Sequence, residues 1–404
     1  MRSVLVALSL LLCASCIGRP VVGERDPGDA AETGTCQDDE MHCGQFGVPP
    51  EVPGIDGNLF REQPCGDERM VMRVDDVQAI GDLDLRCRTL ELTVGNEARV
   101  TLARPLVDDA HIVLIADGAA IVTIQAPVGN NVAIEVEGQS SLRLQAVAGM
   151  DGLRIDATSE TIGWDVEIED SALTAPAVRT GSDAQLVVRG SEVRDPVFQV
   201  GLLSLQTATV ETATMQAKEL IASGTDVRDS DLISRRSTFA TGSMERVTLH
   251  DCETMLVGES VVEDADMGAC AAGPLELRNT TVRNSILRGR SFALQSRISN
   301  SILGTELGSS VSLFDSRINF SLLCSVDAMA ARGGTVLFCA RCHPESPRAA
   351  CIDESTAVAV VNCPELAMAE TCDEGLPESL RGSLSDPILD EPEDDPDPLL
   401  GGDS

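Results

Sequence analysis

Aromatic residues are almost missing from this chain of 404 residues: it has no tyrosine, Trp164 is its only tryptophan, and aromatics make up 2%. Hydrophobic residues nevertheless make up 43%, so any core must be built from Val, Leu, Ile and Ala. Such side chains suit thin stacked layers better than a bulky globular interior. The shortage of aromatic platforms also argues against a long groove in which sugar rings stack.

Common catalytic signatures are missing too. The chain has no Gly-x-Ser-x-Gly motif, no phosphate-binding loop and no dinucleotide fingerprint. Patterns typical of amphipathic helices are scarce, and residues 212–222 are a local candidate. Without such motifs, the sequence does not predict a particular reaction.

Positive charge is in short supply. Lys and Arg number 30 against 65 Asp and Glu, which gives a formal net charge of −35. If an N-terminal signal is removed, Arg2 goes with it and the charge becomes −36. Such a surface repels nucleic acid and anionic headgroups, so neither is an expected partner. A strong negative charge also keeps a protein soluble and monomeric.

The N-terminus has the pattern of an export signal. Met1 and Arg2 precede an apolar run, residues 4–12, that is too short to span a bilayer, and small residues follow. Ala14, Ser15 and Cys16 resemble the lipobox of bacterial lipoproteins, although Cys13 stands where Leu is usual. The resemblance implies a signal peptide at 1–15 and a lipid on Cys16, which would attach the chain to a membrane. An ordinary signal peptide remains the alternative.

Two segments have compositions that do not fold. Residues 16–35 are rich in Gly, Asp, Glu and Thr and are typical of a flexible tether. Residues 374–404 form an acidic tail whose proline-rich, charged run cannot build a core. The folded part is therefore expected between them.

Cysteine usage indicates an oxidising compartment. Without Cys13 and Cys16, twelve of the fourteen cysteines remain, and they fall into even groups that predict disulfides. We expect a Cys-rich N-terminal cap at 36–82, an internal bridge, and a Cys-rich C-terminal segment at 324–373. Spacing does not give the connectivity within the caps. The candidates are Cys36, Cys43, Cys65, Cys87, Cys252, Cys270, Cys324, Cys339, Cys342, Cys351, Cys363 and Cys372.

Between the caps, short alternating runs are bounded by Gly, Asp, Asn or Pro, which is typical of strands. Three similar runs, Leu186–Val193, Leu203–Val210 and Leu220–Val227, follow one another at equal intervals. A similar pattern starts at Leu275, Phe292 and Val311, at nearly the same interval. Such repeats predict coils that turn at small polar residues and stack their strands in parallel, about 4.8 Å per layer.

This pattern of short strands repeated at nearly equal intervals resembles that of right-handed parallel β-helix proteins such as pectate lyases and polygalacturonases. The resemblance implies an all-β fold, a single-stranded right-handed parallel β-helix at 83–323, between the two disulfide-rich caps. A narrower triangular solenoid, similar to bactofilins or left-handed hexapeptide helices, is the alternative. A strict six-residue period is absent.

Two groups of residues have patterns that are typical of metal, haem or catalytic sites. Cys339, Cys342 and His343 match both a half zinc knuckle and the C-x-x-C-H spacing of haem attachment, but disulfides explain these cysteines better. The second group is an acidic cluster, Asp226, Asp229 and Asp231, followed by Arg235 and Arg236. It resembles the site of β-helix polysaccharide lyases, in which carboxylates hold calcium and an arginine acts as the catalytic base. Solvated corners between strands are the simpler interpretation.

We therefore expect no catalytic residues and no cofactor, with calcium as the open alternative. The favoured function is a non-catalytic, lipid-anchored cell-envelope element that acts in the outer membrane or at the cell surface as a surface, adhesion or scaffold protein. Its expected partners are the membrane, through the anchor, and an envelope polysaccharide or a surface protein. The alternative is a calcium-dependent lyase or hydrolase acting on acidic polysaccharide.

Overall fold

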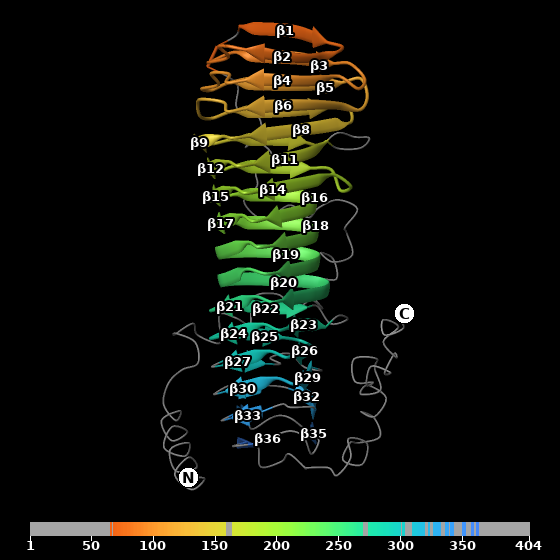
Figure 1. Cartoon of the computed structure of the whole chain (residues 1–404), viewed down its shortest axis with the longest axis vertical. Helices are drawn as coiled ribbons and strands as arrows, with labels where there is room; N and C mark the ends of the chain where they lie inside the picture. The colour runs from red at the N-terminus through yellow and green to blue at the C-terminus, as the bar shows by residue number, and fades with distance from the viewer. Residues whose placement is uncertain are drawn as a thin grey trace, which may run out of the picture.

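The chain winds into a long parallel β-solenoid (Figure 1). The computed structural model describes residues 65–66, 68–158, 164–269, 274–299, 301–303 and 309–319, and beyond these the backbone of the strands up to Asn362. Every pairing between described strands is parallel, and the strands are joined by short turns. The expected all-β parallel β-helix is therefore confirmed.

Each coil contributes a strand to up to three stacks, which are joined where long strands turn a corner. The first stack contains β1 (Arg69–Val74), β3 (Thr89–Val94), β5 (His111–Ala116), β7 (Ala133–Glu137), β10 (Arg154–Ala157), β13 (Ala177–Thr180), parts of β16 (Val197–Gln206), β18 (Thr214–Ser223), β19 (Asp226–Ala240) and β20 (Ser243–Gly258), then β22 (Asp266–Ala269), β25 (Ile286–Arg288), β28 (Ile302–Leu303), β31 (Leu322–Leu323), β34 (Ala340–Cys342) and β37 (Val361–Asn362).

The second stack contains β2 (Val77–Gly81), β4 (Arg99–Ala103), β6 (Ala120–Gln125), β8 (Ser140–Gln145), β11 (Asp165–Glu169), β14 (Gln185–Arg189), the ends of β16, β18, β19 and β20, then β23 (Leu275–Arg278), β26 (Ser291–Leu294), β29 (Ser309–Phe314), β32 (Val326–Arg332) and β35 (Ala350–Ile352). The third contains β9 (Ala148–Asp151), β12 (Ala172–Thr174), β15 (Glu192–Arg194), β17 (Thr209–Glu211), the starts of β19 and β20, then β21 (Val261–Glu263), β24 (Thr281–Arg283), β27 (Arg297–Ser299), β30 (Arg317–Asn319), β33 (Val336–Phe338) and β36 (Ala357–Val358).

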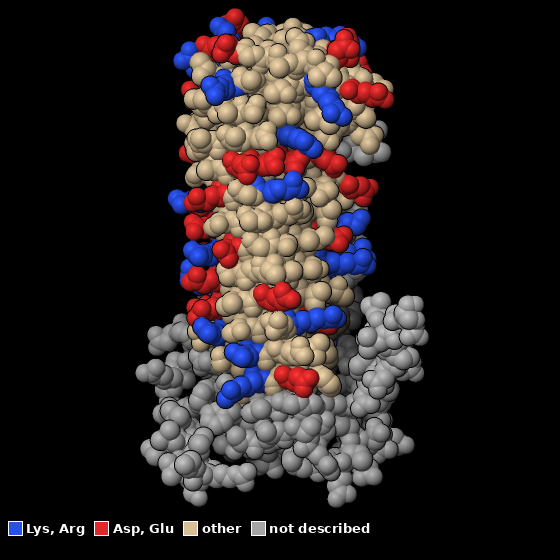
Figure 2. Space-filling view, in the orientation of Figure 1, with Lys and Arg blue, Asp and Glu red and all other residues tan. Residues whose placement is uncertain are grey.

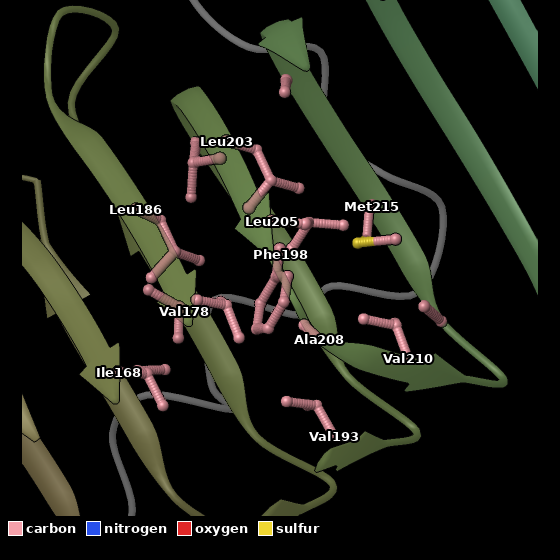
Figure 3. Packing of buried hydrophobic residues seen from close by; sticks show 14 of the residues in the cluster. Ile168, Val178, Leu186, Val193, Phe198, Leu203, Leu205, Ala208, Val210 and Met215 are labelled. Carbon is pink, nitrogen blue, oxygen red and sulfur yellow. The ribbon is translucent and has the colours of Figure 1, made fainter. Parts of the chain in front are cut away.

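Apolar side chains fill the interior in columns. Leu186, Leu203 and Leu220 are in register on neighbouring strands, which confirms that the equal interval between them is the length of one coil. Figure 3 shows Leu186, Leu203 and Phe198 among the side chains of this core, and all three are fully buried. Because alternate residues of a strand face opposite sides, each coil adds one layer of aliphatic side chains to one continuous core.

The register of the later repeat differs from the prediction. Leu275 pairs with Ser291, not with Phe292, and Ser291 in turn pairs with Val311. Ser291 is buried where its column neighbours are apolar, whereas the side chain of Phe292 lies on the outer side. Because Ser291 is polar, the apolar pattern of this repeat begins at Phe292, one position after the true register partner of Leu275.

Small polar residues form the corner between the second and third stacks, as predicted. A residue with positive φ, such as Asn279 or Gln295, is followed by a buried Thr280 or Ser296. The backbone N–H of Thr280 donates to Ser296 Oγ at 3.2 Å, and Ser296 Oγ donates to the carbonyl of Leu294 at 2.9 Å. These hydroxyls satisfy buried backbone groups that the turn would leave unpaired.

The helix expected at 212–222 is wrong, because these residues belong to a turn and to strand β18. Strand β18 bends between the first and second stacks, and its inward side chains are Met215, Ala217, Leu220 and Ala222. One residue separates Met215 from Ala217 before the bend, and one residue separates Leu220 from Ala222 after it. The bend adds one residue between these two pairs, so the spacing of the apolar residues resembles that of a helix.

Strand pairing extends on both sides of the 83–323 range predicted for the β-helix, from Arg69 to Asn362. Cys65 and Cys87 form a disulfide whose Cα atoms are 4.8 Å apart, at the N-terminal end of the rod. For the other ten disulfide candidates, either the residue or its side chain lies outside the described part. Residues 1–35 with Cys16, most of the expected caps, His343 and the acidic tail also lie outside it.

Within the part of the chain that the structure describes, no helix is long and apolar enough to cross a membrane.

Candidate functional site

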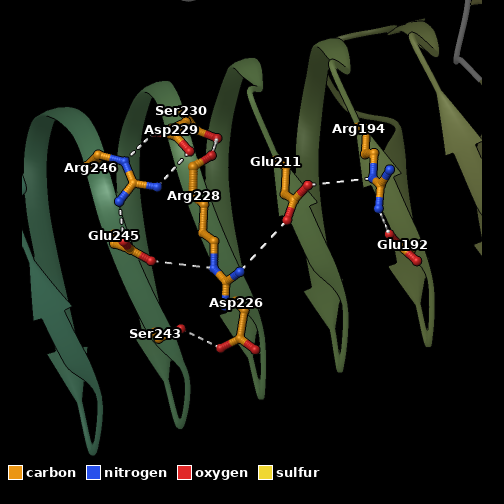
Figure 4. A network of polar contacts seen from close by, with 10 residues as sticks. All are labelled: Glu192, Arg194, Glu211, Asp226, Arg228, Asp229, Ser230, Ser243, Glu245 and Arg246. Atoms are coloured by element: carbon orange, nitrogen blue, oxygen red, sulfur yellow. Dashed lines mark hydrogen bonds and ion pairs between the residues drawn. The ribbon is translucent and has the colours of Figure 1, made fainter.

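The most organised polar feature around the predicted acidic residues is a ladder of alternating charges on the outer side of the third stack (Figure 4). Arg194, Glu211, Arg228 and Glu245 occupy the same position on four successive strands. Arg194 Nε lies 3.5 Å from Glu211 Oε2, Arg228 Nη1 lies 3.8 Å from Glu211 Oε1, and Arg228 Nε lies 3.6 Å from Glu245 Oε2. Parallel stacking therefore places opposite charges next to each other along the rod.

Both ends of the ladder have further partners. Arg194 Nη2 donates to Glu192 Oε1 at 2.6 Å. Arg246 contacts Glu245 and donates to both oxygens of Asp229, at 2.5 and 2.9 Å. Its hydrogen bonds hold the pKa of Asp229 below its usual range, and the two acids raise the pKa of Arg246. The network is exposed, so it is screened by salt and contributes little stability.

The structure does not bring the three predicted calcium ligands together. Asp226 lies on the third stack and accepts a 2.5 Å hydrogen bond from Ser243 Oγ. Asp229, which has φ of 48°, lies at the corner beyond it, and Asp231 lies on the first stack in register with Thr214 and Thr248. Their oxygens do not form a group within 4.8 Å of one another.

The two arginines predicted to accompany them lie farther round the coil. Arg236 belongs to the second stack, where it is in register with Glu219 and Thr254, and Arg235 lies at the bend before it. Strand β19 turns two corners between Asp226 and Ala240, so residues that are close in sequence face different sides. The lyase-like arrangement of carboxylates and arginine is not formed by these side chains.

One described group has metal-ligand spacing: Cys65, Cys87 and Asp109 place one ligand atom each within 4.8 Å. Its two sulfurs are joined in the disulfide. Metal binding by cysteine requires thiolates, and both sulfurs are used in the disulfide, so this group is a disulfide bond with a carboxylate nearby.

Sequence reasoning found Asp226 and Asp229 but missed Arg246 and the ladder. The missed signal was present, because positions 194, 211, 228 and 245 recur at the same interval as the apolar columns. Charges that recur with the structural period and alternate in sign predict a ladder.

Comparison with protein-family models, curated proteins and solved structures found no match.

Proposed function

We propose that the chain is a lipid-anchored cell-envelope rod that acts as a surface or scaffold element and carries out no catalysis. The observation that carries this proposal is the charge ladder. Acidic side chains at the candidate site pair with arginines from neighbouring coils along the rod. An enzyme of the lyase type needs carboxylates from adjacent coils to converge on a metal or a substrate.

The anchor is the second part of the proposal. Ala14, Ser15 and Cys16 resemble a lipobox, and residues 17–35 would separate the lipid from the rod. Residue 17 is Ile, whereas Asp at this position retains lipoproteins at the inner membrane in many diderm bacteria. This supports the outer membrane as the location, with an envelope polysaccharide or a surface protein as partner.

Metabolic labelling tests the anchor. The full chain, expressed in a diderm bacterium with an alkyne-tagged fatty acid, is expected in the membrane fraction with the label. Cys16→Ser should lose the label and appear in the soluble fraction. Cys13→Leu is the matched control, because it changes the neighbouring cysteine toward the usual lipobox and should keep the label. Labelling that survives Cys16→Ser would contradict the anchor.

A separate assay tests the absence of catalysis. Acidic polysaccharides incubated with the mature chain and calcium should show no gain of ultraviolet absorbance from unsaturated sugars and no new reducing ends. Turnover that Asp229→Asn abolishes would refute the scaffold function and favour the calcium-dependent carbohydrate-active alternative.

A further inference from the structure

Three exposed arginines lie close together on the third stack, beyond the charge ladder. Arg283 ends β24, Arg297 begins β27 and Arg317 begins β30. Figure 2 shows basic side chains gathered over β24, β27 and β30, at the lower left of the rod. We call Arg283, Arg297 and Arg317 the arginine patch.

The arginine patch is uncompensated. None of the three guanidinium groups makes an ion pair or a hydrogen bond within the part of the chain that the structure describes, whereas those of Arg194, Arg228 and Arg246 each contact a carboxylate. Glu263 is in register with Arg283 but lies beyond ion-pair distance, and Asp315 lies two residues before Arg317. The patch thus breaks the pairing rule that the same face follows in the earlier coils.

Because the strands stack in register, the arginines of the patch repel one another. Arg297 and Arg317 are in direct register on adjacent strands. Like charges directly opposite each other on neighbouring strands are destabilising. Residues 277–303 contain five arginines and no Asp or Glu, although acidic residues outnumber basic ones by 65 to 30 in the chain. A local anion would remove this repulsion.

The chain itself contains a suitable anion. Residues 386–397 hold seven Asp and Glu and no Lys or Arg. Strand β37 ends at Asn362, and on the third stack β30 is followed by only β33 and β36 among the described strands. Two further layers correspond to about 10 Å along the axis. The part of the predicted acidic tail before this segment, residues 374–385, would span about 19 Å as a flexible linker, more than the height of these two layers.

We propose that the acidic segment 386–397 docks on the arginine patch of its own chain. Carboxylates of the segment accept hydrogen bonds from the guanidinium groups of Arg297 and Arg317, with Arg283 at the edge. A flexible linker of this length gives an effective concentration in the millimolar range, so a weak contact suffices. An external anion would have to displace the segment to reach the patch.

Nuclear magnetic resonance of the tail tests this directly. In the ¹⁵N-labelled mature chain carrying Cys16→Ser for solubility, amide signals of residues 386–397 should be about fivefold weaker than those of 401–404 at about 20 mM NaCl, where screening is weak. They should regain equal intensity at about 0.5 M NaCl, where the Debye length falls to a few ångströms.

Charge-reversal variants locate the contact. Arg297→Glu with Arg317→Glu should restore the tail signals at low salt. Arg99→Glu with Arg104→Glu, two exposed residues on the other end of the rod, makes the same change in net charge and should leave them weak. Asp394→Asn with Asp395→Asn and Asp397→Asn changes only the tail and should also restore the signals, whatever the first variant does to folding.

Several results would overturn the proposal. Tail signals that are equally sharp at low and high salt would exclude docking. Weak signals that persist in both the patch variant and the tail variant would place the tail elsewhere. Attenuation that grows with protein concentration would show docking on a second copy rather than on the same chain.

Discussion

Ser291 offers a direct test of the register of the interior columns. Its side chain is 5% exposed, and its Oγ has no hydrogen-bond partner among the described residues. It stands between Leu275 and Val311 in a column of aliphatic residues. A buried hydroxyl without a partner costs about 1–3 kcal/mol.

Ser291→Ala should therefore stabilise the protein, by about 1 kcal/mol, because it removes the hydroxyl without adding volume. Ser291→Val should add about 1 kcal/mol more if the layer accepts the extra methyl group. Ser296 is the matched control: it is 1% exposed, accepts from the N–H of Thr280, and has the carbonyls of Leu277 and Leu294 within 3.2 and 2.9 Å. Ser296→Ala should destabilise by about 1–2 kcal/mol.

Urea unfolding of the mature chain, followed by circular dichroism, measures these differences. With m of about 3 kcal/mol/M, a change of about 1 kcal/mol would move the midpoint by about 0.3 M if the rod unfolds as a unit. The two alanine variants should shift in opposite directions. A loss of stability in Ser291→Ala equal to that of Ser296→Ala would refute the register, because both hydroxyls would then be satisfied.

Three further predictions follow from other contacts. Phe198→Ala should cost about 3–5 kcal/mol because a fully buried ring is removed, whereas Val261→Ala, at a 44% exposed site, should stay within about 0.5 kcal/mol in the same urea assay. In a double-mutant cycle, Asp229→Asn and Arg246→Gln should show a small favourable coupling that disappears at about 1 M NaCl, and a coupling unaffected by salt would contradict an exposed ion pair. The hydrogen bond from Arg86 lowers the pKa of Asp84 from 3.8 to about 2, so its contribution to stability is complete above about pH 4 and is lost as the pH falls toward 2. A carboxyl titration by NMR should show this pKa return toward 3.8 in Arg86→Gln, and an unchanged value would refute the assignment.

The fold was predictable because its determinants are local and periodic. Apolar residues at 186, 203 and 220 recur with the length of one coil, and small polar residues such as Ser191 and Ser296 mark the corners. The bend inside β18 was not predictable from a simple period. A strand that turns a corner shifts its alternation by one residue, and single-period reasoning mistakes this for a helix.

The candidate site was harder to predict for the same reason. Asp226, Asp229 and Asp231 are neighbours in sequence, but the corner of β19 at Asp229 leaves Asp226 on the third stack and Asp231 on the first. Arg246, in contrast, reaches Asp229 from a distant position in the sequence because the next coil brings it alongside. In a solenoid, the residue one coil away is a nearer neighbour than the residue three positions along the chain.

The most direct test of the scaffold proposal is a crystal structure of the mature chain grown with calcium, inspected at the third stack. If the rod is a scaffold, Arg246 should contact Asp229, the ladder from Arg194 to Glu245 should be intact, and no ion should lie among the acidic side chains. A calcium ion held by Asp226 or Asp229 together with a carboxylate from a neighbouring coil would contradict it and favour the calcium-dependent enzyme.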